Sequence, residues 1–205
     1  MQTIPETVIP QIKHMYSHEQ RSAREIAEKM HYSIDAVYYV MRKYHIKRRS
    51  SKQNNRLLFN RKPLSFKVKQ PLTTADRMLL IAGCMLYWAE GYKTDKSAGI
   101  DFANSDPNMQ KLFVRFLRQI CNVTESRIRV QLYCHHGADV QSQISYWNDL
   151  LSIPKDQFTK PYINPKAALD KKDKMPYGLV HIRYYDKKLL QQVMSWIQEY
   201  QTKLQ

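Results

Sequence analysis

Glu90 is the residue whose position first suggests chemistry. It closes an apolar stretch, residues 73–91, that reads TTADRMLLIAGCMLYWAEG and has the spacing of a helix. A helix C-terminus carries a partial negative charge, so a carboxylate there costs roughly 0.3–1 kcal/mol unless a cation offsets it. A divalent metal ion or a nearby basic side chain would provide that offset. A carboxylate exposed to solvent at a helix end is the alternative.

The same stretch has the signals of a helix that packs closely against a second one. Thr73 and Asp76 form a capping-box pattern at its start, and Gly91 suits the left-handed position after its end. Large and small residues alternate along one face, with Gly83 beside it. Small residues let a second backbone approach closely, so we expect this face to form a dimer interface through Leu79, Ala82, Leu86 and Ala89.

Residues 86–91, LYWAEG, resemble the second half of the LAGLIDADG motif of homing endonucleases, with Glu90 at the position of the final acidic residue. Residues 99–117 resemble the strand and helix that follow in that fold, and the resemblance covers roughly residues 73–204. It implies that two motif helices pack together and that their terminal carboxylates hold divalent metal ions over the scissile phosphates of DNA. One motif supplies one carboxylate, so cleavage would need a homodimer with Glu90 as catalytic and metal-binding residue and Mg²⁺ as cofactor.

Residues 1–46 have the spacing of a helix-turn-helix DNA-binding domain, with three helices between residues 7 and 44. Ala27 places a small residue where the second and third helices would cross, and Ser33 caps the third helix. That third helix would enter the major groove and hold flanking phosphates. A three-helix cap with packing tyrosines is the alternative. The predicted DNA contacts are Ser33, Asp35, Tyr38, Tyr39, Arg42 and Lys43.

The net charge of +15 is concentrated between two better balanced regions. Residues 46–75 hold nine Lys or Arg and no Asp or Glu. Basic side chains gain affinity for a phosphate backbone by releasing condensed counterions. We therefore expect the linker, residues 47–72, to contact DNA as well as to join two domains; a disordered, solvated tether is the alternative. Its predicted contacts are Lys47, Arg48, Arg49, Arg56, Arg61 and Lys62.

Residues 73–205 predict an α+β domain with a small, mainly antiparallel sheet and a charged loop at residues 167–175. The expected order is helix, strand, helix, strand, helix, strand, strand, helix. Residues 127–134 alternate as a strand whose polar face suits a DNA groove, and a solvated sheet face is equally compatible. The predicted contacts on this strand are Arg127, Arg129 and Gln131.

Two features depart from the nuclease family. There is room only for a very short first strand at residues 92–95, and an additional helix at residues 140–151 interrupts the second half. Both departures argue against a large sheet that reads bases, so we expect the helix-turn-helix domain to recognise the DNA sequence. No internal repeat is visible, so we count one motif.

The composition argues against several other classes of protein. No run of about 18 apolar residues occurs, so no membrane span is expected, and the N-terminus lacks a signal-peptide pattern. Three widely spaced cysteines favour a reducing cytoplasm over a disulfide framework. In a bacterial cell, we expect a DNA-binding protein of this kind to associate with the nucleoid. Cys134, His135 and His136 have no second ligand pair at zinc-finger spacing, which argues against zinc.

The sequence therefore predicts a homodimeric, sequence-specific protein that binds double-stranded DNA, with a regulatory role. This set of parts is similar to bacterial regulators that join a degenerate LAGLIDADG domain to a helix-turn-helix. An active homing endonuclease is the first alternative. An RNA-binding protein is the second, which the helix-turn-helix disfavours because A-form RNA hides its major groove.

Overall fold

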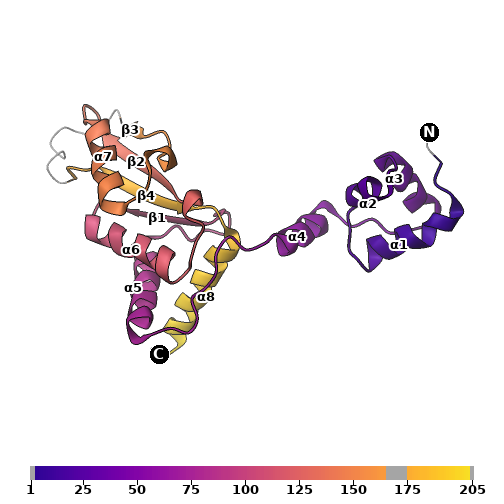
Figure 1. Cartoon of the computed structure of the whole chain (residues 1–205), viewed down its shortest axis with the longest axis horizontal. Helices are drawn as coiled ribbons and strands as arrows, with labels where there is room; N and C mark the ends of the chain where they lie inside the picture. Colours follow the sequence, from indigo (N-terminus) through magenta and orange to yellow (C-terminus); the bar gives the residue numbers. More distant parts are fainter. Residues whose placement is uncertain (1–2, 165–174, 204–205) are drawn as a thin grey trace. The chain divides into compact units, whose positions relative to one another are not determined.

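The computed structural model describes residues 3–164 and 175–203 and divides the chain into two compact units, Met1–Pro63 and Leu64–Gln205 (Figure 1). Over this described part, the chain forms eight α-helices and one mixed sheet of four strands, which confirms the predicted α+β class. The predicted charged loop lies almost entirely outside the described residues. Each unit has its own buried core, so each is described by itself.

The first unit is built on three short helices that follow a 3₁₀ turn, η1 (Glu6–Val8). They are α1 (Ile9–Ser17), α2 (Ala23–Met30) and α3 (Ile34–Lys43), close to the predicted ranges. Helices of this length are marginal in isolation, so their packing against one another stabilises them. All three contribute to the core, through Ile12, Met15, Ile26, Ala27, Val37, Val40 and Met41.

Side-chain caps determine where α2 and α3 begin. Ser22 and Glu25 form a reciprocal capping box at the start of α2. Ser33 accepts a hydrogen bond from Ala36 N at 3.2 Å and so caps α3. His31 ends α2 in the left-handed conformation, with a φ of 57°, where glycine is the usual residue.

The predicted linker, residues 47–72, contains an unpredicted helix, α4 (Ser51–Arg61). It begins at a capping box between Ser50 and Gln53. None of its residues is buried. The spacing of Ser50 and Gln53 was the available signal for this helix, which has no apolar face of helical period to accompany it.

Residues 64–72, which the prediction assigned to the linker, belong to the second compact unit. The backbone N–H groups of Lys67 and Lys69 each donate a hydrogen bond of 2.9 Å to carbonyls just after helix α6 (Pro107–Gln119). Phe66 and Leu72 pack against the second core. This segment therefore satisfies its backbone on the second unit instead of remaining a solvated tether.

The sheet of the second unit has the strand order β1-β4-β2-β3. Strands β1 (Ile100–Asn104) and β2 (Arg129–His135) both pair antiparallel with β4 (Leu179–Tyr184), and β3 (Tyr162–Asn164) pairs parallel with β2. The element order is the predicted one. The predicted short strand at residues 92–95 is absent, and Gly91 instead makes a single bridge to Phe102.

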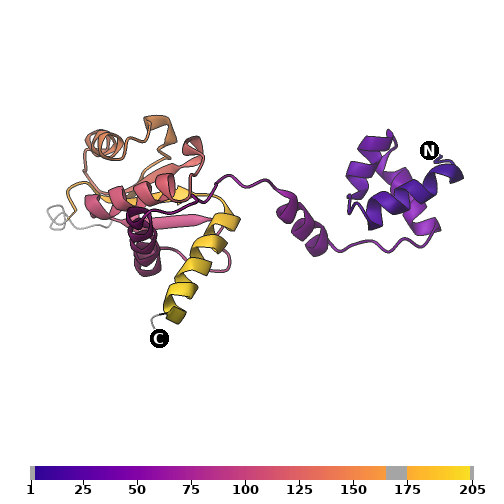
Figure 2. The ribbon, with the colours of Figure 1, turned by 60° about the horizontal axis from the view of Figure 1, so that its bottom comes forward.

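Helices α5 (Thr74–Glu90), α6 and α8 (Lys187–Lys203) gather on one side of the sheet (Figure 1). Figure 2 shows α5 and α8 extending from the sheet beside each other, and they are in contact. The additional helix α7 (Val140–Leu151) packs against α6. The alternate residues of the strands that face this core are fully buried: Ile100, Phe102, Val130, Leu132, Val180 and Ile182.

The predicted capping box of α5 forms as expected. Thr73 Oγ1 accepts from Asp76 N at 3.2 Å, and Asp76 accepts in return from Thr73 N. The Lys69 ammonium lies 2.8 Å from the Asp76 carboxylate and, with Thr73, lowers its pKa to about 2. Lys69 therefore has a partner inside the second unit.

Gly91 does not take the predicted left-handed conformation after α5. Its φ is −80° and its ψ is 149°, which is extended backbone. A side chain is still impossible here, since a Cβ would lie 2.6 Å from the carbonyl oxygen of Tyr87. The glycine is required by close packing and not by backbone conformation.

All three cysteines are buried and unpaired. Burial raises the pKa of the Cys84 thiol to about 12 and also raises those of Cys121 and Cys134. They act as small apolar residues of the second core.

Gly83 lies where α5 packs against Phe116 of α6. A Cβ at this position would lie 2.2 Å from Cγ of Phe116, a side chain that is fully buried. The close helix–helix approach that small residues suggested is therefore made within the chain.

We expect Gly83→Ala to lower the free energy of unfolding of the second unit by about 1–3 kcal/mol, because the Phe116 ring has nowhere to move. Chemical denaturation of the full chain would measure it. Ser195→Thr, which adds one heavy atom at an exposed position of α8, should change stability by less than about 0.5 kcal/mol. Equal stability of the two variants would contradict this packing.

Candidate nucleic-acid interface

The outer face of α3 is the most accessible group of predicted DNA contacts. Ala36, Val37, Val40 and Met41 turn inward, while the predicted contacts Asp35, Tyr39, Arg42 and Lys43 are exposed. Tyr39 is 50% exposed. This face therefore offers an aromatic ring, a hydroxyl and two cations to a partner.

Tyr38 is less available than predicted. It is half-buried against the first core, and the Arg48 guanidinium lies 4.1 Å from the centre of its ring. Two predicted DNA contacts from the helix and the linker are thus in contact with each other. The stacked guanidinium keeps its charge at the edge of the α3 surface.

Lys43 already has local partners. Its contact with Tyr44 and its ion pair with Glu6, at 3.7 Å, raise its pKa above the usual value. The ammonium therefore remains charged. An exposed ion pair of this kind is weak, so a phosphate can replace Glu6 at little cost.

Arg49, another predicted contact, is used inside the first unit. Its guanidinium donates to the carbonyls of Tyr16, at 3.1 Å, and Arg21, and to Asn54 Oδ1 at 3.1 Å. It also lies 4.0 Å from the centre of the Tyr16 ring. Arg49 therefore positions α4 against α1 and α2, and this interaction leaves it little capacity for DNA.

The other linker cations divide into two groups. Arg61 pairs with Glu25 at 3.4 Å and donates to Glu19 O, so it secures the far end of α4. Lys62 is also engaged in an interaction. Lys47 and Arg56 are exposed, and the described residues give neither of them an ion-pair partner.

The sheet face away from the helices carries a polar network that sequence patterns did not indicate. Asp101 accepts from Arg183 Nε at 2.8 Å and lies 2.8 Å from His181 Nδ1. Arg183 also donates to Gln131, a predicted contact whose amide nitrogen donates to Lys160 O. Burial raises the pKa of Asp101, but these two partners outweigh it and hold the pKa below its usual range.

A row of aromatic rings crosses the same face. Tyr92 lies 5.8 Å from His181, His181 lies 4.6 Å from Tyr133, and Tyr133 lies 5.1 Å from Tyr162, measured between ring centroids. The alternation of His181 and Arg183 in the clearest predicted strand was the available signal. Their partners could not be found, because the pairing of β1 with β4 joins residues about eighty positions apart.

Arg127 and Arg129 are partly engaged by backbone carbonyls. Arg127 donates to Tyr185 O at 2.8 Å, and Arg129 donates to Ser126 O and Ile128 O at 2.7 and 2.8 Å. Their side chains remain half-buried at the edge of the sheet face. Arg127 and Arg129 therefore contribute positive electrostatic potential to this sheet face, while many of their hydrogen-bond donors are already used.

The predicted dimer face of α5 is only partly exposed. Leu79 is 6% exposed and lies in the second core, and Leu86 is half-buried against that core. Ala82 is half-buried and Ala89 is exposed. Helical spacing does not indicate which face the chain itself covers, so it could not show that Leu79 is buried. The apolar side chains of the other side are here named the α5 stripe: Met78, Ile81 and Trp88 are exposed, and Met85 between them is half-buried against the core.

Glu90 is exposed at the end of α5. Lys93 Nζ donates to Trp88 O at 2.7 Å, so a cation does lie at the negative end of this helix. Among residues 3–164 and 175–203, no three His, Cys, Asp or Glu side chains are placed to hold a metal ion.

Comparisons with protein-family models, curated proteins and solved structures found no match. In the part of the chain that the structure describes, no helix is both long and apolar enough to cross a membrane.

Proposed function

We propose that the chain is a sequence-specific protein for double-stranded DNA, with a helix-turn-helix domain in residues 1–46 as its reading module and α3 as its recognition helix. One observation carries this proposal. The capped helix α3 buries its inner face in the first core and leaves Tyr39, Arg42 and Lys43 exposed on its outer face. A helix of this length and composition fits a DNA major groove.

The details of the turn between α2 and α3 support the same proposal. Ala27 is buried where α2 contacts α3, and His31 occupies the left-handed position that usually takes glycine. Ser33 is used as the cap of α3, so its hydroxyl serves DNA binding mainly by fixing where the recognition helix begins. The predicted phosphate contacts that remain available beside α3 are Lys47, Arg48 and Arg56.

We expect Arg42→Ala to weaken binding to duplex DNA and to make the slope of log affinity against log salt shallower by about 1, because one phosphate contact is lost. Fluorescence anisotropy across a salt series would measure both effects. Lys111→Ala removes the same charge from an exposed position on α6 and should leave both quantities unchanged. Wild-type affinity in Arg42→Ala would rule out α3 as the recognition helix. Stronger binding to duplex RNA than to DNA would favour the RNA-binding alternative.

The homodimer of this proposal uses the α5 stripe. Its members are spaced three, four and three residues apart, as in the seam of two packed helices. Met78, Ile81 and Trp88 are 62%, 44% and 45% exposed, an unusual concentration for one helix face. Ala82 and Ala89 lie beside the stripe and would let the partner helix approach.

We expect Ile81→Glu to convert a dimer into monomers in analytical ultracentrifugation, because a carboxylate in the seam would lose its water without gaining a partner. Leu58→Glu makes the same change at an exposed leucine of α4 and should leave the dimer intact. A dimer in both variants would remove α5 from the interface.

An active nuclease is the second candidate, and the exposed carboxylate of Glu90 at the end of the proposed dimer helix is the observation that favours it. Glu90 of one protomer with Glu90 of its partner would supply two carboxylates to Mg²⁺, which polarises the scissile phosphate when bound. Under the regulatory proposal, wild type and Glu90→Gln both bind a randomised duplex library with Mg²⁺ or Mn²⁺ and leave it intact. Cleavage by wild type that Glu90→Gln loses would make the protein an endonuclease.

A further inference from the structure

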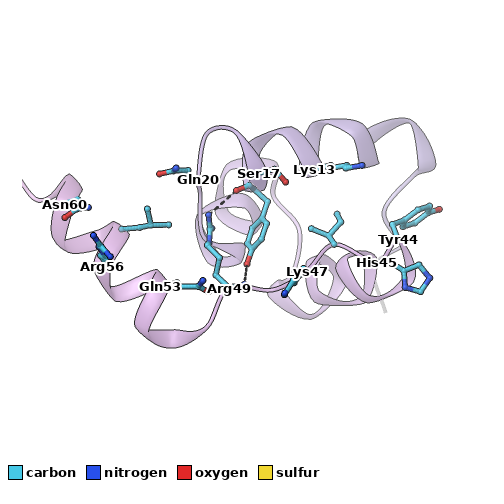
Figure 3. A pocket seen from close by; sticks show the side chains of 13 residues that line it. Lys13, Ser17, Gln20, Tyr44, His45, Lys47, Arg49, Gln53, Arg56 and Asn60 are labelled. Atoms are coloured by element: carbon cyan, nitrogen blue, oxygen red, sulfur yellow. Dashed lines mark hydrogen bonds between the residues drawn. The ribbon is translucent and has the colours of Figure 1, made fainter.

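The first unit contains a cleft of about 560 Å³ beside α4 (Figure 3). Its walls come from α1, from the segment that joins α3 to α4, and from one side of α4. The volume is within the range of sites that bind small molecules. The lining includes Lys13, Tyr16, Ile46, Lys47, Arg56 and Leu57.

The charge of this cleft is of one sign. Lys13, Lys47, Arg49 and Arg56 line it, and no lining residue is acidic. Arg49 is occupied by its carbonyl partners. The other three are exposed, and no described residue forms an ion pair with them. Cations from three different segments therefore surround one cavity without a counter-charge.

The wall formed by α4 is held at its two ends. Arg49 attaches its beginning to the carbonyls of Tyr16 and Arg21, and Arg61 attaches its end to Glu19 and Glu25. Between these attachments α4 buries no side chain. A ligand that contacts Arg56 together with Lys13 would add the missing contacts along its middle and stabilise α4 in place.

We propose that this cleft is an anion-binding site for phosphoryl groups, with an organic phosphate of nucleotide size as its ligand. Several cations without an acid match a ligand with more than one negative charge. The side chains of Ser17, Gln20 and Gln53 offer neutral hydrogen-bond partners, and Leu57 and Ile46 offer apolar surface for the rest of the molecule. A phosphoryl group has two sources here, a free nucleotide or the backbone of bound DNA.

Isothermal titration of the full chain with ADP, with inorganic pyrophosphate and with a short DNA duplex distinguishes these sources. The test variant is Lys47→Gln combined with Arg56→Gln. The matched control, here called the Lys52 variant, is Lys52→Gln combined with Lys111→Gln, which also removes two charges from exposed residues outside the cleft. Adenosine, which has no phosphate, controls for binding through the apolar surface alone.

We expect ADP and pyrophosphate to bind wild type and the Lys52 variant, and to bind the double variant about tenfold more weakly. That result supports the site with a free ligand. If the small phosphates do not bind and duplex affinity falls in the double variant but not in the Lys52 variant, the site takes a DNA phosphate.

Equal behaviour of the double variant and the Lys52 variant toward every phosphate overturns the proposal, as does adenosine binding as tightly as ADP. The inference does not require α3 to read DNA. Arg42→Ala, which tests the recognition helix, should bind ADP as wild type does, because Arg42 does not line the cleft. Failure of the two proposals can therefore be distinguished.

Discussion

The close approach of α5 to α6 determines what the rest of the second unit can offer to a partner. Gly83 admits the Phe116 ring into the space where a Cβ would stand, and this contact orients α5 on the sheet. Leu79, Leu80, Cys84 and Tyr87 then turn into the core. On the opposite side of the helix, Met78, Ile81 and Trp88 remain exposed among the described residues, so the α5 stripe follows from where the glycine lies. Any surface available for association on this helix is a consequence of its own packing.

Arginine and lysine have different tasks in the first unit, and the difference follows from their donors. Arg49, just before α4, and Arg61, at its end, each donate to backbone carbonyls and hold a helix that buries no side chain. A planar guanidinium can do this because it carries several donors in a fixed geometry, whereas an ammonium on a flexible stem is easily exchanged. The lysines of the same region remain at the surface. A high count of basic residues therefore overstates how much positive charge faces outward.

Patterns among residues close in the sequence predicted much of the fold. Contacts between residues far apart in the sequence could not be predicted. The caps at Ser22, Ser33 and Thr73 were readable because each involves residues three positions apart. Helix α4 was missed because it has no apolar periodicity. The contacts of Asp101 with His181 and Arg183 depend on strand pairing, which no short pattern encodes. On α5 the helical period was readable, but the burial of Leu79 in the second core was not, because periodicity defines a helix surface and not which side its own fold covers.

The burial of the three cysteines makes their thiols unreactive in the folded protein. Thiolates, and not thiols, react with oxidants, alkylating reagents and soft metals. With each thiol enclosed in the second core and its ionisation suppressed, the folded chain is inert to these reagents. Reaction at a cysteine therefore reports opening of that core, so the native thiols act as built-in reporters of unfolding.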